Sequence, residues 1–264
     1  MIETKQTESG IAMFSVAGAD SSTADIDSLK KAKKMIDEKQ DAEKIRQETG
    51  WFIGLDGNWR YEISDRYAKL KFVPEDGQTT TLGNILKHDK LFDAYPFLRE
   101  MKVHGRNMKQ SIMGAVVRNI MGASIHMNAL KKMNNDTARK VLMHEVQHLI
   151  QRYEGFAVGG NMDALGAIEQ QEVEAQIENA LKEREQALSA KDQRALDAAW
   201  KKADQLTRRG LSREQKYELY RRLAGEVESR NVEARINLPE SGIKLIPPLD
   251  ALDVFKENVI VKFD

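Results

Sequence analysis

The stretch VLMHEVQHLI, residues 141–150, constrains this chain more than any other, because it places two of the five histidines on one short segment. The surrounding sequence NNDTARKVLMHEVQHLIQRYEG predicts a helix that Asn135 or Asp136 caps and that Gly155 ends. Its apolar residues recur at helical spacing and predict one buried stripe: Leu142, Val146, Leu149 and Tyr153.

His144 and His148 lie four residues apart, so their side chains share one face of this helix, well away from the apolar stripe. That spacing allows two imidazoles to bind one tetrahedral metal ion. Glu145 lies about 100° round the helix from His144 and can reach a metal-bound water instead of the ion itself. The pattern H-E-x-x-H therefore predicts two metal ligands and a general base, whereas the alternative is a surface histidine pair on an amphipathic helix.

A catalytic zinc site needs a third protein ligand, and the chain has no cysteine to supply it. No histidine follows His148 closely, so we expect a carboxylate from a later segment. The best candidate segment is YRRLAGEVESRNVEAR, within a helix predicted from about Ser212 to Arg235. Glu226 borders the buried stripe of that helix and is the favoured third ligand, with Glu228 as the alternative.

The composition excludes several classes of protein. The number of lysine and arginine residues, 41, equals the number of aspartate and glutamate residues, also 41. There is therefore no basic excess to point to nucleic acid or to an anionic membrane surface. No apolar run approaches the roughly 20 residues of a membrane span, and the N-terminus lacks the pattern of a signal peptide. We expect a protein that binds neither nucleic acid nor membranes.

Other segments predict a mixture of helices and strands, an α+β chain. Residues 1–24 are expected to be flexible apart from the apolar IAMFSV, and residues 22–50 to form one helix or a broken pair. Asp56-Gly57 predicts a β-hairpin, and GASIHMN, residues 122–128, predicts a strand with one polar face. Residues 167–209 predict two charged helices that meet near LSAKDQ, and VIVKF predicts a closing strand.

Five stretches of the sequence resemble the zincin-like metallopeptidase domain of large polyvalent proteins from phages and mobile elements. They are MFSVAGADSSTAD, RQETGWFIGLDGNWRYEIS, LMHEVQHLIQRYEGFAVGG, YRRLAGEVESRNVEAR and NVIVKF, in the order of that family and over nearly the whole chain.

The resemblance implies a minimal zincin-like fold over residues 25–264: a small mixed sheet, an active-site helix and a second helix that carries the glutamate. His144, His148 and Glu226 would be the zinc ligands and Glu145 the base. The strand at residues 122–128 would be the edge strand beside the cleft. Residues 167–209 would be a long, charged helical insertion, either a solvated hairpin or an arm that binds a protein partner.

The expected activity is that of a zinc-dependent endopeptidase acting on a protein or peptide substrate. Glu145 would take a proton from the attacking water, and a second donor would stabilise the oxyanion. Tyr220 is the favoured candidate for that donor, and Arg230, His126 and His104 are the alternatives. His88 is expected in a surface loop. The competing hypotheses are a metal-containing binding or virion-associated module without turnover, and a helical interaction protein without metal. The resemblance also implies a bacterial host cytoplasm as the location.

Overall fold

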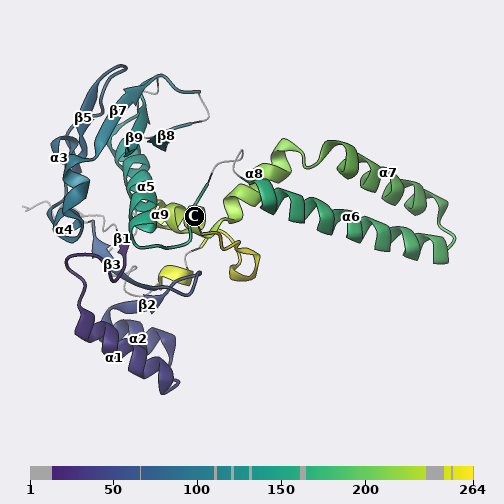
Figure 1. The fold of residues 1–264 in the computed structure, drawn as a ribbon, viewed down its shortest axis with the longest axis horizontal. Coiled ribbons are helices and arrows are strands. Elements are labelled where there is room, and N and C mark those ends of the chain that lie inside the picture. The colour runs from purple at the N-terminus through teal and green to yellow at the C-terminus, as the bar shows by residue number, and fades with distance from the viewer. Residues whose placement is uncertain are drawn as a thin grey trace, which may run out of the picture.

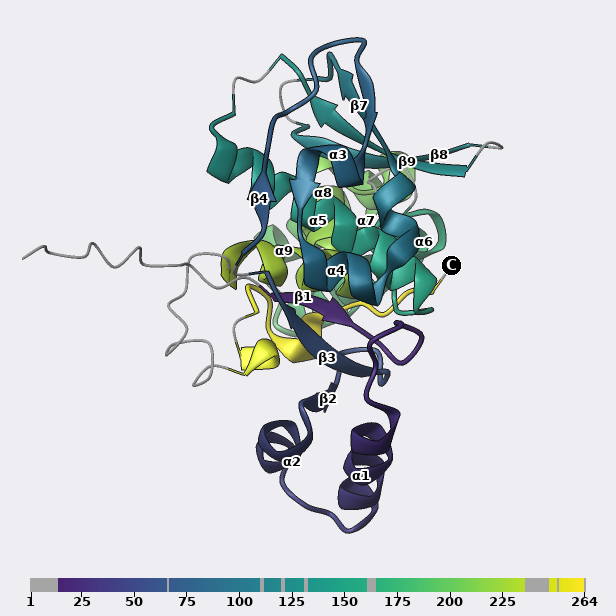
Figure 2. The same ribbon diagram turned by 90° about the vertical axis from the view of Figure 1, so that its left-hand side faces the viewer.

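The computed structural model describes residues 14–65, 67–109, 112–119, 122–130, 133–160, 165–235, 247–250 and 252–263, and it has the expected α+β composition. Two sheets lie on either side of a central pair of helices, and a helical hairpin extends from this body (Figures 1 and 2). Within the described ranges no helix combines the length and apolar character needed to cross a lipid bilayer.

The larger sheet has four strands in the order β5-β7-β9-β8. Its members are β5 (Thr79–Thr81), β7 (Lys102–Arg106), β8 (Gly114–Asn119) and β9 (Gly122–Asn128). β7 and β9 run parallel, while the other neighbours are antiparallel. The prediction of a strand at residues 122–128 is confirmed, but the expectation that it forms the edge is wrong. β8 pairs with the outer side of β9 and is itself the edge strand.

The smaller sheet joins β1 (Phe14–Ala17), β2 (Trp51–Ile53) and β3 (Trp59–Ser64) in the order β1-β3-β2. The hairpin predicted at Asp56-Gly57 connects β2 to β3, and Gly57 has φ 84°, as such a turn requires. Below this sheet lie α1 (Ile26–Asp37) and α2 (Ala42–Thr49), a broken pair. Asp25 caps α1, and Gly50 ends α2 in the left-handed conformation.

The first described residues are part of this sheet. β1 pairs antiparallel with β3, and Val16 and Ala17 are buried. Beyond the strand, the backbone N–H of Ser22 donates to the Ala94 carbonyl at 2.8 Å. Residues 14–16 belong to the apolar IAMFSV, which was excepted from the expected flexibility. The residues after it, up to Thr23, contact the body through hydrogen bonds of Ser21, Ser22 and Thr23, contrary to the expectation for that part. Residues 1–13 lie outside the described part of the chain.

Helix α5 (Asn135–Tyr153) is the centre of the molecule. Asn134, one residue before the predicted pair, caps this helix, and the Asn134 side chain accepts a hydrogen bond from the Thr137 N–H. Three of the four predicted stripe residues are buried, whereas Tyr153 is half exposed and stacks on Phe97. The stripe packs against apolar side chains of the larger sheet and of the short helices α3 (Leu82–Ile85) and α4 (Asp89–Ala94): Val103, Ile125, Met127, Leu82, Leu91.

The remaining short elements connect these layers. β4 (Lys69–Leu70) and β6 (Leu86–Lys87) pair antiparallel as a third, two-stranded sheet, and 3₁₀ turns lie at Pro96–Glu100, Pro248–Asp250 and Lys256–Asn258. Of the C-terminal tail, residues 236–246 lie outside the described ranges. The predicted strand VIVKF is extended, but only Ile260 forms a β-bridge, with Leu223.

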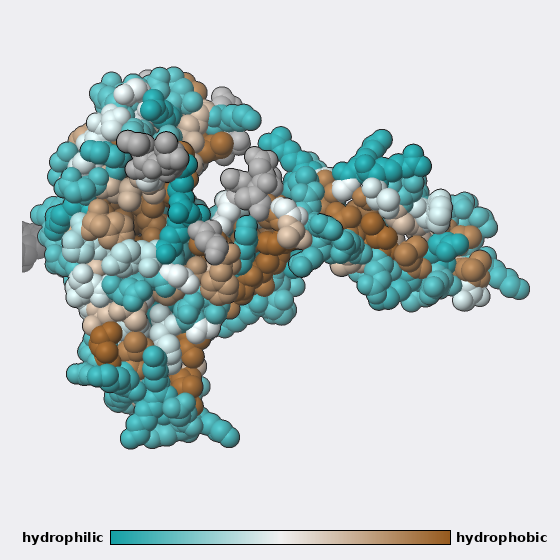
Figure 3. Space-filling view, viewed as in Figure 1, coloured by the Kyte–Doolittle hydropathy of each residue, from teal (hydrophilic) through white to brown (hydrophobic). Residues whose placement is uncertain are grey.

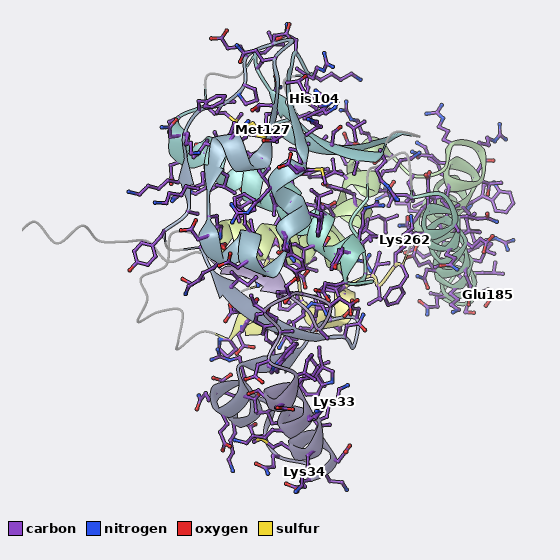
Figure 4. All side chains as sticks on the ribbon, turned by 60° about the vertical axis from the view of Figure 1, so that its left-hand side comes forward. Lys33, Lys34, His104, Met127, Glu185 and Lys262 are labelled. Carbon is purple, nitrogen blue, oxygen red and sulfur yellow. The ribbon has the colours of Figure 1, made fainter. Side chains whose placement is uncertain are left out.

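The charged helical region forms α6 (Gly166–Ser189) and α7 (Gln193–Arg209), which pack on each other as a hairpin. In Figure 4 the labelled Glu185 lies on this arm, while Lys33 and Lys34 lie on α1 and His104 and Met127 on the larger sheet. The arm leads into α8 (Arg213–Arg222) and α9 (Ala224–Arg235), of which α9 packs against α5.

A buried charge network holds α9, α5 and the hairpin turn together. Arg60 is 3% exposed and lies between two carboxylates: its Nε donates to Glu228 and its Nη1 and Nη2 donate to Asp56 at 2.6 and 3.0 Å. Burial alone would raise the pKa of Asp56, but the hydrogen bonds and charge of Arg60 hold it well below its usual value. The second oxygen of Glu228 accepts from Gln147 and Gln151 of α5.

We expect Arg60→Ala to destabilise the protein by about 3–5 kcal/mol, because it leaves two carboxylates buried without their cation. Urea denaturation followed by circular dichroism measures this change. The control is Arg208→Ala, since Arg208 is exposed on α7 and its ion pair among the described residues is with Asp204, one turn away. That change should stay within about 0.5 kcal/mol. Equal effects of the two substitutions would contradict a structural role for the network.

Candidate metal centre

His144 and His148 come together on one face of α5, as their spacing predicts. Their Nε2 atoms lie 3.2 Å apart and the two ring centroids 4.8 Å apart. Both side chains are mostly buried, with 16% and 15% of their surface exposed. The two nitrogens therefore converge on one point beside the helix.

The second helix of the site differs from the prediction of one helix from Ser212 to Arg235. Ser212 does cap α8, but the helix breaks at Leu223, whose ψ is 131°. An extended C-terminal segment occupies the break: Ile260 donates to the Arg222 carbonyl, and Ala224 donates to the Ile260 carbonyl, both at 2.8 Å. The backbone groups at the junction thus find partners outside the helix, and α9 starts in a new direction.

Close backbone packing fixes where α9 begins. Gly225 lies so near Val158 and Gly159 that any Cβ at this position would collide with their backbone atoms. This contact places the first turn of α9 against the Gly-rich segment that follows α5. Glu226, the third residue of α9, is 1% exposed and faces the two histidines.

Glu226 completes a group of three possible ligands with His144 and His148. Its Oε1 lies 3.4 Å from His148 Nε2, and its Oε2 lies 3.7 Å from His144 Nε2. The same oxygens accept hydrogen bonds from the Gly160 N–H at 3.1 Å and from the Tyr220 hydroxyl at 2.7 Å. Glu228, the alternative ligand, faces Arg60 instead and is not part of the group.

These distances suit a small divalent cation. Two ligand nitrogens about 2.0–2.1 Å from one tetrahedral zinc ion lie about 3.3 Å apart, close to the Nε2 separation here. Two imidazoles and one carboxylate are also the donor set of many catalytic zinc sites. There is no room for a larger residue at Gly159, since a Cβ there would collide with the Glu226 carboxylate and approach His148 Cε1 to 2.7 Å. The residues present therefore fit a metal ion.

Gln151 and Ser229, which the sequence did not single out, lie within hydrogen-bond distance of the His148 ring, and Glu233 forms a longer ion-pair contact with the His144 ring. Gln151 Oε1 lies 3.0 Å from His148 Nδ1, and Ser229 Oγ lies 3.3 Å from the same atom. Glu233 Oε2 lies 3.6 Å from His144 Nδ1. Such partners fix ring orientation and leave Nε2 free to bind a metal. Gln151 is fully buried and lies one turn after His148 on the same helix. A glutamine at that spacing is the sequence signal from which its contact with His148 could have been predicted.

Glu145 is the other carboxyl group of this region, 7% exposed and directed toward the edge strand β8. A Cβ at Gly114 would lie 2.9 Å from Glu145 Oε1, and the Val116 N–H donates to its carboxylate. Burial is the main cause that raises the pKa of Glu145 to about 7; the charge of His144 opposes this rise and that of Glu226 adds to it.

The three possible ligands, His144, His148 and Glu226, interact strongly through their charges. Burial would lower the pKa of His144, but the carboxylates of Glu226 and Glu233, 3.7 and 3.6 Å from its ring nitrogens, raise it to about 9. Burial would raise the pKa of Glu226, but the nearby charges of His148 and His144 and the hydrogen bond from Tyr220 lower it to about 2. Burial lowers the pKa of His148, although the charge of Glu226 opposes this, so the local charges favour the protonated form of His144 alone.

The other predicted candidates lie elsewhere or have other partners. The rings of His104 and His126 meet edge to face with their centroids 5.0 Å apart. They contact Thr79 and Ser124 on the sheet face opposite the core residues that alternate with them. Arg230 pairs with Asp253 and donates to a carbonyl of α8.

The expectation for His88 is wrong. It is 4% exposed, caps α4 and bonds to the buried Asp65 at 2.6 Å. A histidine in a polar sequence is typical of a surface loop. Here its side chain hydrogen-bonds a buried carboxylate and caps the N-terminus of a helix.

Comparison with known families gives one partial match. Residues 14–71 match the model of the large polyvalent protein associated domain 23. Neither the curated proteins nor the solved structures contain a match to this chain. The matched segment covers β1 to β4 and includes Arg60 and Asp56, but none of the three possible metal ligands. It supports the polyvalent-protein part of the resemblance and says nothing of a peptidase.

We expect Glu226→Gln to weaken zinc binding by more than about tenfold, whereas Glu228→Gln keeps zinc and lowers the unfolding temperature. The physical reason is that Glu226 faces the histidines while Glu228 neutralises Arg60. Competition with a chromogenic chelator measures the affinity, and a thermal melt of the metal-free protein measures the stability. Loss of zinc in the Glu228 variant alone would reverse the assignment.

Glu233→Ala should weaken zinc binding by about 10–100-fold, the usual effect of removing an outer partner of a ligand histidine. The matched control is Glu178→Ala, since Glu178 is an exposed glutamate on α6 that pairs only with Lys182. The same chelator competition is the measurement. Unchanged affinity in the Glu233 variant would mean that His144 needs no carboxylate behind it.

Proposed function

We propose that this chain is a zinc-dependent endopeptidase with a zincin-like catalytic fold. The observation that carries the proposal is the convergence of His144, His148 and Glu226 beside a buried glutamate, Glu145, that faces an edge strand. A purely structural metal site has no need for that extra carboxyl group, and it keeps no open position for a substrate.

His144 Nε2, His148 Nε2 and a Glu226 oxygen would hold the zinc ion. When bound, zinc supplies Lewis-acid polarisation of the scissile carbonyl and lowers the pKa of a bound water to about 7. Glu145 accepts a proton from the attacking water at its carboxylate and passes it to the nitrogen of the leaving amine. Its carboxyl group interacts electrostatically with His144 and Glu226, which supports a place for it near the bound water.

Tyr220 is the second catalytic residue of the proposal. Burial raises the pKa of its hydroxyl and the charge of Glu226 raises it further, so the group stays protonated. Its hydrogen bond to Glu226 Oε2 keeps it next to the ligand cluster. The hydroxyl has one proton, so it would give up its hydrogen bond to Glu226 in order to donate to the oxyanion that develops on the substrate carbonyl. Arg230 is less suited, because Asp253 already neutralises it.

The substrate of this proposal is an extended protein segment. β8 is the edge of its sheet, and Glu145 lies against that edge through Gly114 and Val116. A peptide that pairs with an edge strand presents its backbone at regular intervals, which brings one peptide bond to the metal. The arrangement of edge strand, histidine-bearing helix and glutamate-bearing helix supports the zincin-like assignment.

The test is Glu145→Gln, which should reduce cleavage by about 10²–10⁴-fold and leave the zinc content unchanged. Cleavage is measured with fluorescein-labelled casein and with a pooled peptide library analysed by mass spectrometry. Gln keeps the shape of the side chain but cannot accept the proton. Wild-type cleavage rates in this variant would contradict the mechanism.

A zinc-loaded wild-type protein that cleaves none of these substrates would favour the alternative, a metal-stabilised binding module without turnover. In that case removal of zinc by a chelator would lower the unfolding temperature. The metal-content measurement separates both of these functions from a helical interaction protein that binds no metal.

A further inference from the structure

Strands β7, β8 and β9 of the larger sheet come from a segment whose charges are not balanced. Residues 101–135 contain six lysine or arginine residues and no aspartate or glutamate. The six residues are Lys102, Arg106, Lys109, Arg118, Lys131 and Lys132. The equal totals of the whole chain hide this local excess, and the expectation of no nucleic-acid partner rested on those totals. Charge that gathers on one part of a protein attracts partners of opposite charge to that part.

The sheet turns part of this charge toward solvent. Val103 of β7 and Ile125 of β9 are completely buried in the core with α5. Because successive side chains of a strand point to opposite faces, the residues that alternate with them lie on the other face of the sheet. With their neighbours on β5 they are exposed or partly exposed, and we call them the outer face: Thr79, Thr81, Lys102, His104, Arg106, Ser124 and His126. In the view of Figure 3 the part of the body that holds β5 and β7 is mostly hydrophilic.

The two cations of the outer face are not neutralised. Neither Lys102 nor Arg106 forms an ion pair with any residue that the structure describes. Burial lowers the pKa of His104, and the charges of Arg106 and Lys102 lower it further, so both cations act on the centre of the face. The outer face therefore has a positive potential that an anionic ligand would offset.

Two carboxylates lie near one end of the outer face. Glu75 and Asp76 belong to the turn before β5, which contacts Gly105 of β7. Asp76 accepts hydrogen bonds from the backbone and the side chain of Asn107, at 3.0 and 2.7 Å. Since neither carboxylate pairs with a cation of the outer face, the positive charge of that face stays available to a ligand.

The neutral groups of the outer face suit an anionic ligand of one kind. The rings of His104 and His126 meet edge to face, and each has one nitrogen near a hydroxyl group: Thr79 Oγ1 at 2.8 Å and Ser124 Oγ at 3.3 Å. Lysine, arginine, serine and threonine are common donors to the phosphate groups of nucleic acids. Histidine rings also stack on unpaired bases. The side chains of the outer face are thus of the types that contact nucleic acids.

The layout of the outer face favours a nucleic-acid strand over a protein partner. Lys102, His104 and Arg106 form a row along β7, with about 6.6 Å between neighbours in the row, from the rise of a strand. This spacing is comparable to the separation of successive phosphates along an extended nucleic-acid strand. A protein interface has an apolar centre, and the described outer residues of β5, β7 and β9 provide none.

We propose that the outer face binds single-stranded nucleic acid through its phosphate backbone, independently of base sequence. Lys102 and Arg106 contact phosphates at the two ends of the row, and the rings of His104 and His126 contact an unpaired base between them. None of these contacts reads the hydrogen-bonding edge of a base. The outer face is on the other side of the sheet from α5, so the proposal depends neither on the metal centre nor on peptidase activity.

The experiment measures the binding of fluorescein-labelled oligo(dT) to the full chain by fluorescence anisotropy over a series of salt concentrations. We expect salt-sensitive binding that stoichiometric zinc leaves unchanged. The double substitution Lys102→Ala/Arg106→Ala should weaken binding by about tenfold or more at low salt. It should also reduce the slope of log K against log salt concentration by about 1.4, since each phosphate contact of a single strand contributes about 0.7.

The matched control is Lys33→Ala/Lys34→Ala, which removes the same charge from α1. Figure 4 shows these two lysines at the opposite end of the molecule from His104. The control should keep the affinity and the salt slope of the wild-type protein, and circular dichroism checks that each variant keeps its fold. No oligonucleotide binding by the wild-type protein, or equal losses in the two double variants, would overturn the proposal.

Competition with a polyglutamate peptide of the same charge separates nucleic acid from an acidic protein. We expect the peptide to compete about fivefold less well or worse, because it has no bases to stack on the imidazole rings. Equal competition would make the outer face a site for acidic proteins and overturn its assignment to nucleic acid. His126→Ala should weaken oligo(dT) binding by about fivefold without changing the salt slope. Unchanged affinity in this variant would overturn the base contact.

Discussion

The buried Arg60 is the constraint on which the rest of the body depends. A guanidinium without water must have anionic partners close by, and here they come from two distant segments. Asp56 belongs to the hairpin turn and Glu228 to α9, so one cation joins the smaller sheet to the glutamate-bearing helix. Phe156, just after α5, stacks on the other side of the same guanidinium at 3.8 Å. Three elements thus meet around one charge.

This network also decides which glutamate can reach the histidines. Residues 226 and 228 are two apart, so they point in different directions from a helix. Glu228 forms its hydrogen bonds with Arg60, Gln147 and Gln151. These bonds fix the rotation of α9 about its axis, so that Glu226 lies beside His144 and His148. The segment that matches the polyvalent-protein domain therefore contributes to the site through support and not through ligands.

The helix break at Leu223 also helps to bring Glu226 to the histidines. A continuous helix would have kept the direction of α8, but the bridge to Ile260 and the close contact at Gly225 start α9 anew. Tyr220 lies before the break and Glu226 after it, so the turn folds the hydroxyl back onto the carboxylate. The site thus combines a possible metal ligand, its hydrogen-bond donor and the buried carboxyl group of Glu145 within a region of low solvent exposure, where charge interactions are strong.

Local patterns in the sequence determined the α+β composition, the hairpin at Asp56-Gly57, the histidine-bearing helix, the two arm helices and the presence of a strand at residues 122–128. These features depend on periodicity, capping and turn residues, which act over a few positions. The pairing of His144 with His148 belongs to this group, because helical geometry alone brings them together.

Only the tertiary structure decided the rest. It placed β8 at the sheet edge, broke the helix at Leu223, buried His88 against Asp65 and separated the role of Glu226 from that of Glu228. Three of these outcomes depend on a partner distant in the chain, which is Ile260, Asp65 or Arg60, whereas β8 pairs with the next strand, β9. A buried charge or an unpaired backbone group is satisfied wherever the fold provides a partner, and spacing within one segment carries no information about that partner.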